Sequence, residues 1–118
     1  MKTVLVVDDE KAIRDMIVAL LEEVGYQVAT AQSGLEAIDC LSEVQPDLVL
    51  SDVMMPGMEG GHLAAIMHAR PEYRAIPVVG MTALNELRRD YDANFAAVVH
   101  KPFEIAVLLE TIESTLMR

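Results

Sequence analysis

The sequence predicts an α/β fold, a doubly wound (βα)5 domain in which a parallel five-stranded sheet lies between two layers of helices. The chain has 118 residues, which is the size of one domain. It is 53% hydrophobic, which is enough to fill a packed core. Short apolar segments alternate five times with amphipathic ones, as in sheets whose parallel strands are joined by helical crossovers. We therefore expect one three-layer domain over residues 1–118.

Five short segments have the composition of strands. Four are nearly continuous apolar runs, which is typical of strands covered on both faces. The second segment alternates more between apolar and polar residues, which indicates a position nearer the edge of the sheet. The predicted strands span residues 4–7, 26–31, 48–50, 77–79 and 97–99.

The segments between these strands carry apolar residues at helical spacing. Gly25 is placed to end the first helix, and Pro46 cannot continue the second. The predicted helices span residues 12–24, 35–44, 60–69, 84–93 and 104–117. The side chains expected to face the sheet include Ile13, Ile17, Leu20, Leu21 and Val24 in the first helix, Leu35, Ile38 and Leu41 in the second, and Val107, Leu108, Ile112 and Leu116 in the last.

The charge of the chain excludes some partners. There are 19 acidic against 9 basic residues, a formal net charge of −10, so attraction to nucleic acid or to anionic lipid is disfavoured. The single cysteine, Cys40, cannot form an internal disulfide, and no apolar run has the length of a membrane span or a signal peptide. We expect a soluble cytoplasmic protein with no direct contact to nucleic acid and no membrane insertion.

Carboxylates follow two strands that should be neighbours. With strand order 2-1-3-4-5, ligands bind beyond the carboxyl ends of the first and third strands. The first strand leads into Asp8, Asp9 and Glu10, and the third into Asp52. Two such charges about 4 Å apart repel by roughly 4 kcal/mol at an effective dielectric constant near 20. Either a proton is shared or a divalent cation binds, and oxygen ligands favour Mg²⁺ (or Mn²⁺).

A pair of adjacent acids is more often part of a solvated loop, so Asp8 and Asp9 alone would be weak evidence. Acidic residues after both strands favour the metal site. Thr82 and Lys101 follow the fourth and fifth strands and would add a hydroxyl group and a cation at the same edge. Taken singly, such a Thr is usually a helix cap and such a Lys a loop residue. Together they indicate that an anionic ligand binds beside the metal.

These residues stand in four segments, VLVVDDE, DLVLSDVMMPGMEG, VVGMTA and VVHKPF. In this order and spacing, they resemble the receiver domain of two-component response regulators over essentially the whole chain. The resemblance implies Mg²⁺-dependent transfer of a phosphoryl group from a phosphohistidine donor to an aspartate. It implies as partners a histidine kinase or histidine phosphotransfer protein, and a downstream protein target or output domain.

The resemblance also implies a role for each site residue. Asp52 would be the phosphoacceptor, Asp9 a direct metal ligand, and Asp8 a ligand acting through water. The backbone carbonyl of Met54 would complete the protein ligands of the metal. Lys101 would pair with a phosphoryl oxygen and the hydroxyl of Thr82 would bind another. Such a chain is no conventional enzyme, yet it would catalyse its own phosphorylation and dephosphorylation at Asp52.

The sequence departs from the family's pattern at several positions. Val98 occupies the position where receivers usually have an aromatic residue, whose side chain swings inward as the threonine moves toward the phosphate. The usual coupling between these two side chains is therefore in question here. Only 18 residues separate Thr82 from Lys101, about one helical turn fewer than is common, which predicts a short or atypical fourth helix. Its few apolar residues predict low hydrogen-exchange protection over residues 84–93. By the same resemblance, Met54 and Leu84 occupy positions that tune hydrolysis of the phosphoaspartate in this family. Both are apolar here, which predicts exclusion of the attacking water and a long-lived phosphoaspartate.

The resemblance further makes the Lys101–Pro102 bond a candidate cis peptide. His62, His68 and His100 lack the spacing of a zinc site, and we expect them at or near the surface.

Two other classes of protein remain open. A pseudo-receiver would be a binding module that never takes up phosphate. A small phosphohydrolase with an aspartate nucleophile usually has a second acidic residue two positions after the first, where this chain has Met54. Incubation with a small phosphodonor and Mg²⁺ would separate the three classes. A receiver would accumulate an adduct on Asp52, a pseudo-receiver would form none, and a phosphohydrolase would turn the donor over rapidly.

Overall fold

A computed structural model of the chain describes residues 1–53, 60–83 and 94–118. Five parallel strands form one sheet in the order β2-β1-β3-β4-β5, as the sequence predicts. The strands are β1 (Thr3–Val7), β2 (Gln27–Ala31), β3 (Leu48–Asp52), β4 (Val78–Ala83) and β5 (Ala97–Lys101). The sequence placed them correctly but ended three of them too early, since β3, β4 and β5 continue to Asp52, Ala83 and Lys101.

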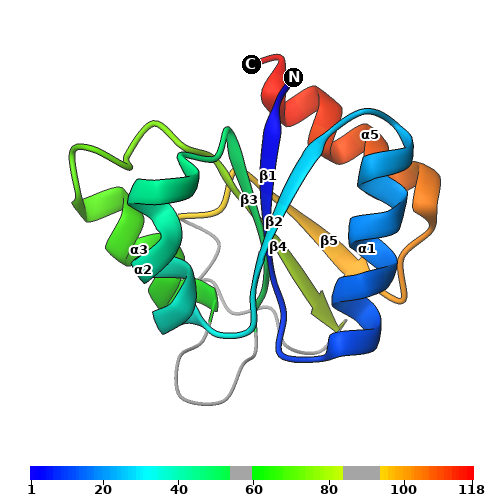
Figure 1. Ribbon diagram of the computed structural model, residues 1–118, viewed down its shortest axis with the longest axis horizontal. Coiled ribbons are helices and arrows are strands. Elements are labelled where there is room, and N and C mark those ends of the chain that lie inside the picture. Colours follow the sequence, from blue (N-terminus) through cyan, green and yellow to red (C-terminus); the bar gives the residue numbers. More distant parts are fainter. Residues whose placement is uncertain (54–59, 84–93) are drawn as a thin grey trace.

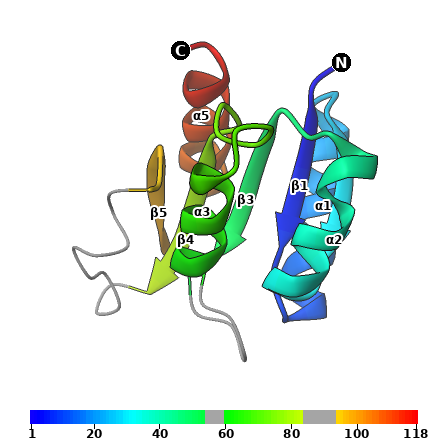
Figure 2. The same cartoon turned by 90° about the vertical axis from the view of Figure 1, so that its left-hand side faces the viewer.

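Helices cover both faces of this sheet (Figure 1). They are α1 (Lys11–Glu23), α2 (Gly34–Val44), α3 (Gly60–Ala69) and α5 (Ile105–Leu116). With α2 and α3 in front, Figure 2 shows α1 and α5 behind the strands. The predicted fourth helix, residues 84–93, lies outside the described residues. Within the part of the chain that is described, no helix has the length and apolar character that a membrane span requires.

Alternate residues of the central strands β1, β3 and β4 supply the two cores. On one face, Val4 and Val6 of β1 pack with Ile17 of α1 and Ile112 of α5. On the other face, neighbouring strand residues pack with α2 and α3; examples are Leu5, Val7, Leu41, Leu63 and Met67. Because every strand residue in the middle of the sheet meets one core or the other, the strands read as continuous apolar runs.

Three predicted core positions are wrong. Leu35 is 63% exposed, Val107 47% and Val24 54%. The buried face of α2 consists instead of Gly34, Ala37 and Leu41. Leu35 directly follows Gly34 and is therefore rotated by about 100° around the helix axis, away from this face.

In α5 the buried positions are Leu108, Ile112 and Thr115, so the adjacent Val107 is turned outward. Val24 is the residue that caps the end of α1. It stands before Gly25, whose φ of 99° lies in the left-handed region that glycine adopts freely.

The two chain ends lie at the amino-terminal edge of the sheet (Figure 1). Arg118 Nη1 donates a hydrogen bond of 3.2 Å to the carbonyl of Ala96, directly before β5. The predicted site residues follow the opposite ends of the strands, so the described structure separates the termini from the candidate site by the length of the sheet.

Candidate functional site

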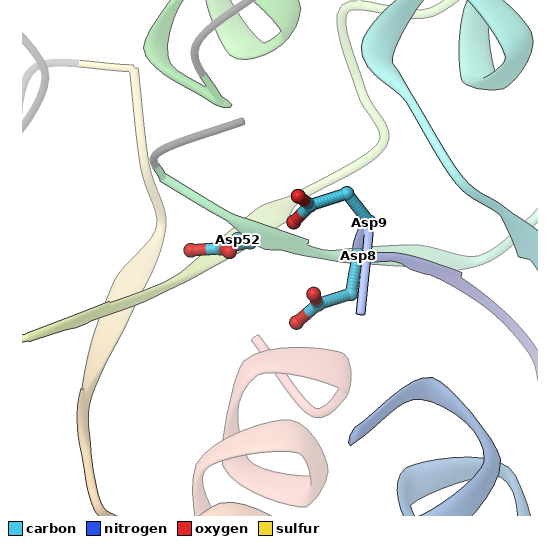
Figure 3. Close-up of side chains that lie close together, drawn as sticks. All are labelled: Asp8, Asp9 and Asp52. Atoms are coloured by element: carbon cyan, nitrogen blue, oxygen red, sulfur yellow. The ribbon is translucent and has the colours of Figure 1, made fainter. Parts of the chain in front are cut away.

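The register of the sheet brings the predicted acidic residues together. Val7 of β1 pairs with Ser51 of β3, so Asp8 and Asp52 follow at the same level of two adjacent strands. One carboxylate oxygen from each of Asp8, Asp9 and Asp52 can be chosen so that all three lie within 4.8 Å of one another. Figure 3 shows these side chains gathered at the carboxyl ends of β1 and β3.

The three carboxylates differ in their exposure to water. Asp8 is fully buried and Asp52 is 7% exposed, whereas Asp9 is exposed. The Glu10 N–H donates a hydrogen bond of 2.9 Å to Asp8 Oδ1, which fixes the buried carboxylate against the start of α1. The cluster therefore has a fixed inner side and an open outer side at Asp9.

Lys101 joins two of these acids from the end of β5. Its Nζ lies 3.4 Å from Asp8 Oδ2 and 3.4 Å from Asp52 Oδ2, and the side chain is 19% exposed. Burial by itself lowers the pKa of Lys101, but the charges of Asp52 and Asp8 and the hydrogen bonds to them outweigh it, so the pKa is raised. The peptide bond to Pro102 is cis, as the resemblance implied.

The charge and chemistry of this cluster suit a divalent cation. Three carboxylates against the one ammonium group that contacts them among the described residues leave two negative charges. The donor atoms are all carboxylate oxygens, which hard cations such as Mg²⁺ prefer. Since the exposed Asp9 leaves one side open, the residues present fit a metal that keeps several waters.

The other predicted residues lie at or near the same edge. Thr82 is fully buried in β4 and pairs with His100 of β5, one residue before Lys101. Val98 is half-buried and pairs with Gly80. Met54 and Leu84, and with them the predicted carbonyl ligand, lie outside the described residues.

The three histidines are exposed, as predicted. Cys40, a free thiol, is half-buried on α2. In this part of the chain, none of these four side chains joins the acidic cluster of Asp8, Asp9 and Asp52.

Sequence reasoning missed one residue beside the site and one packing contact within the sheet. Arg14 of α1 donates a hydrogen bond of 2.7 Å from Nη1 to the backbone carbonyl of Asp8. Phe95, which precedes β5, packs its ring against Gly80 of β4. Arg14 sits on the helix that follows the acids, which was an available signal, but a bond to a backbone carbonyl has no sequence pattern of its own.

Comparison with known families gives a match over nearly the whole chain. The model described as "Response regulator receiver domain" matches residues 4–113. The polar-differentiation response regulator DivK of Brucella abortus is 32% identical over 98% of this chain and 96% of that protein. The DNA-binding dual master transcriptional regulator RpaA of Synechocystis is 29% identical over 100% of this chain, which spans 50% of that longer protein.

Solved structures with the same fold agree. The chemotaxis response regulator CheY4 of Vibrio cholerae has a TM-score of 0.90 and 31% identity, with 98% of each chain covered. The response regulator TrrA of Thermotoga maritima, solved in complex with Mg²⁺–BeF, has a TM-score of 0.89 and 32% identity, with 98% of this chain and 99% of that chain covered.

Proposed function

The chain belongs to the response regulator receiver domain family of two-component signalling, and from this premise we propose that Asp52 accepts a phosphoryl group from a phosphohistidine donor. The observation that carries the proposal is the contact of Lys101 with both Asp8 and Asp52 beside the exposed Asp9. This arrangement combines a carboxylate nucleophile, a cation and a set of metal ligands at one edge of the sheet.

In the proposed transfer a carboxylate oxygen of Asp52 attacks the phosphorus atom. The new P–O bond forms while the P–N bond to the imidazole breaks, and the electron pair stays on the imidazole nitrogen, which then takes up a proton. Lys101 would hold a phosphoryl oxygen with its ammonium group, and the Thr82 hydroxyl would donate to another. Such fixed donors stabilise charge that spreads over the phosphoryl oxygens in the transition state.

We place a Mg²⁺ or Mn²⁺ ion on Asp8, Asp9 and Asp52, with the backbone carbonyl of Met54 as a further ligand. When bound, the ion would neutralise charge between the carboxylates and the incoming phosphoryl group. TrrA, a relative of similar length, was solved with Mg²⁺–BeF, which supports this placement.

The experiment that tests the proposal uses the full chain with a small phosphodonor, acetyl phosphate, and Mg²⁺. Intact mass spectrometry should detect the gain of one phosphoryl group. Asp52→Asn should abolish this gain, and Asp39→Asn, a change at an exposed acid of α2, should leave it intact. A wild-type chain without an adduct would instead support a phosphorylation-independent binding module, and rapid repeated turnover of the donor would support a phosphohydrolase.

We propose that the phosphodonor is a histidine kinase or a histidine phosphotransfer protein in the cytoplasm. An apolar groove lined by Ile13, Met16, Pro102 and Phe103 reaches Lys101, so its surface is continuous with the candidate site. Met16 is 46% exposed there. A protein that delivers its phosphohistidine to Asp52 would cover this groove, because the two surfaces share Lys101.

This proposed contact is tested with two donors. Met16→Lys should slow transfer from a phosphorylated histidine phosphotransfer protein and leave transfer from acetyl phosphate unchanged. Equal rates of phosphoryl transfer from the phosphotransfer protein to wild type and to the variant would show that the groove is not part of the donor interface.

We further propose that phosphorylation of Asp52 alters contacts with a downstream protein target or output domain, without direct binding of nucleic acid.

A further inference from the structure

Arg14 connects α1 to the end of β1. Its guanidinium Nη1 donates a hydrogen bond of 2.7 Å to the backbone carbonyl of Asp8, and the side chain is half-buried. Its own N–H donates a bond of 3.0 Å to the carbonyl of Glu10 in the first turn of the helix. Arg14 therefore holds both sides of the short connection formed by Asp8, Asp9 and Glu10.

Each polar group of Asp8 forms a hydrogen bond. Its N–H donates to the carbonyl of Ala31 at 3.1 Å, and its two carboxylate oxygens accept bonds from the Glu10 N–H and from Lys101. Its carbonyl accepts from Arg14. Because Asp8 is fully buried, these partners take the place of water.

Asp9 differs sharply from its neighbour. It is exposed, and within the described residues no hydrogen bond fixes its carboxylate. Its position near Asp52 therefore depends on the backbone on either side. The carbonyl of Asp8 belongs to the peptide unit that leads directly into Asp9, and Arg14 is the side chain that holds it.

We propose that Arg14 is a positioning residue for the metal site, which sets the affinity for Mg²⁺ by holding the peptide unit between Asp8 and Asp9. The inference rests on the proposed function, since it concerns the same site. Outer partners that orient metal ligands commonly change metal affinity by about 10–100-fold when they are removed. A ligand held in place before the ion binds loses less conformational freedom on binding.

The charge of Arg14 acts in the opposite direction. A guanidinium near the cluster repels an incoming cation, so removal of the charge alone would tighten Mg²⁺ binding. Removal of the hydrogen bond would weaken it. The two effects differ in sign, and one variant therefore shows which of them dominates.

The test measures Mg²⁺ affinity by isothermal titration calorimetry on the full chain, with no phosphodonor present. Arg14→Met should bind Mg²⁺ about tenfold more weakly than wild type, the low end of the range because lost repulsion offsets part of the effect. Arg14→Lys, which keeps the charge and one donor, should fall between the two. Lys11→Met removes a cation from the same helix whose partner is the exposed Asp15, and it should bind at least as tightly as wild type.

Thermal melting in EDTA checks that each variant is folded, and if Arg14→Met does not fold then Arg14→Lys carries the test. Mg²⁺ binding by a folded Arg14 variant that is as tight as in wild type, or tighter, would overturn the role of Arg14 alone. A wild-type chain that binds no Mg²⁺ would overturn the proposed metal site, and the role of Arg14 with it.

Discussion

The ring of Phe95 occupies the space that Gly80 leaves open on β4. A Cβ atom added at residue 80 would lie 3.2 Å from Cε1 of Phe95 and 3.1 Å from Cγ2 of Val53. Both distances are shorter than ordinary van der Waals contacts. Since Val53 directly follows Asp52, this packing supports the backbone that carries the proposed phosphoacceptor.

Gly80→Ala should lower the free energy of unfolding by about 1–2 kcal/mol. Overpacking costs roughly 1–3 kcal/mol, and loss of chain entropy in the unfolded state offsets about 0.4–1 kcal/mol of that. Urea denaturation measures the change. Phe95→Leu replaces the ring with a smaller side chain. The double variant Gly80→Ala/Phe95→Leu should therefore lose less unfolding free energy than the sum of the losses in the two single variants. Strict additivity of the two losses would show that the ring and the new methyl group do not meet.

The raised pKa of Lys101 determines how the free energy of unfolding should change at alkaline pH. Its pKa is raised in the folded protein, so its stabilising contribution is complete below the unfolded-state pKa of about 10.4 and is lost as the pH rises through the higher folded pKa. The difference in unfolding free energy between wild type and Lys101→Met should be constant near neutral pH and shrink above about pH 10.4. Burial also raises the pKa of Tyr26, but this residue is present in both proteins and cancels. A difference that grows with alkaline pH would contradict the prediction.

Mg²⁺ should stabilise the folded chain. A ligand that binds only the folded state adds about 2.7 kcal/mol at a concentration of 100 times its Kd, so the Tm should rise steadily with Mg²⁺ and fall back on addition of EDTA. Asp9→Asn should remove most of this rise, because Asp9 is the exposed carboxylate of the cluster. Asp15→Asn, at an exposed acid that pairs with Lys11, should retain it. Equal Mg²⁺ responses in the two variants would argue against a site at Asp9.

Met54→Asn should shorten the lifetime of the phosphoaspartate. The sequence places an apolar residue two positions after Asp52, where a polar group would orient the attacking water. The lifetime is measured by intact mass after removal of the donor, with Met117→Asn at an exposed position of the C-terminal end as the control. An unchanged rate of phosphate release would refute this role of Met54.

The elements of the fold were predictable because parallel strands buried on both faces leave a strong pattern. Val4 and Leu5 face opposite cores, so both must be apolar and the strand reads as a continuous run. The gathering of Asp8 and Asp52 followed from strand order alone, since the carboxyl ends of adjacent parallel strands share an edge.

Features that depend on side-chain reach or on fine rotation were not predictable. Leu35 and Ala37 are both apolar and only two positions apart, and the sequence could not tell which of them meets the sheet. The bond from Arg14 to the Asp8 carbonyl depends on where α1 begins relative to β1, a geometry that no spacing encodes. The contact of Phe95 with Gly80 joins a residue before β5 to a residue within β4, so neither position is informative alone.

The position of the chain ends has a practical consequence for assays. Both termini lie at the amino-terminal edge of the sheet (Figure 1), whereas Asp52 and Lys101 are the last residues of β3 and β5, at the opposite edge. A fluorescent label, an affinity tag or a surface tether attached to Met1 or Arg118 would thus point away from the donor. Immobilised or fused forms of the chain should accept a phosphoryl group as fast as the untagged chain does.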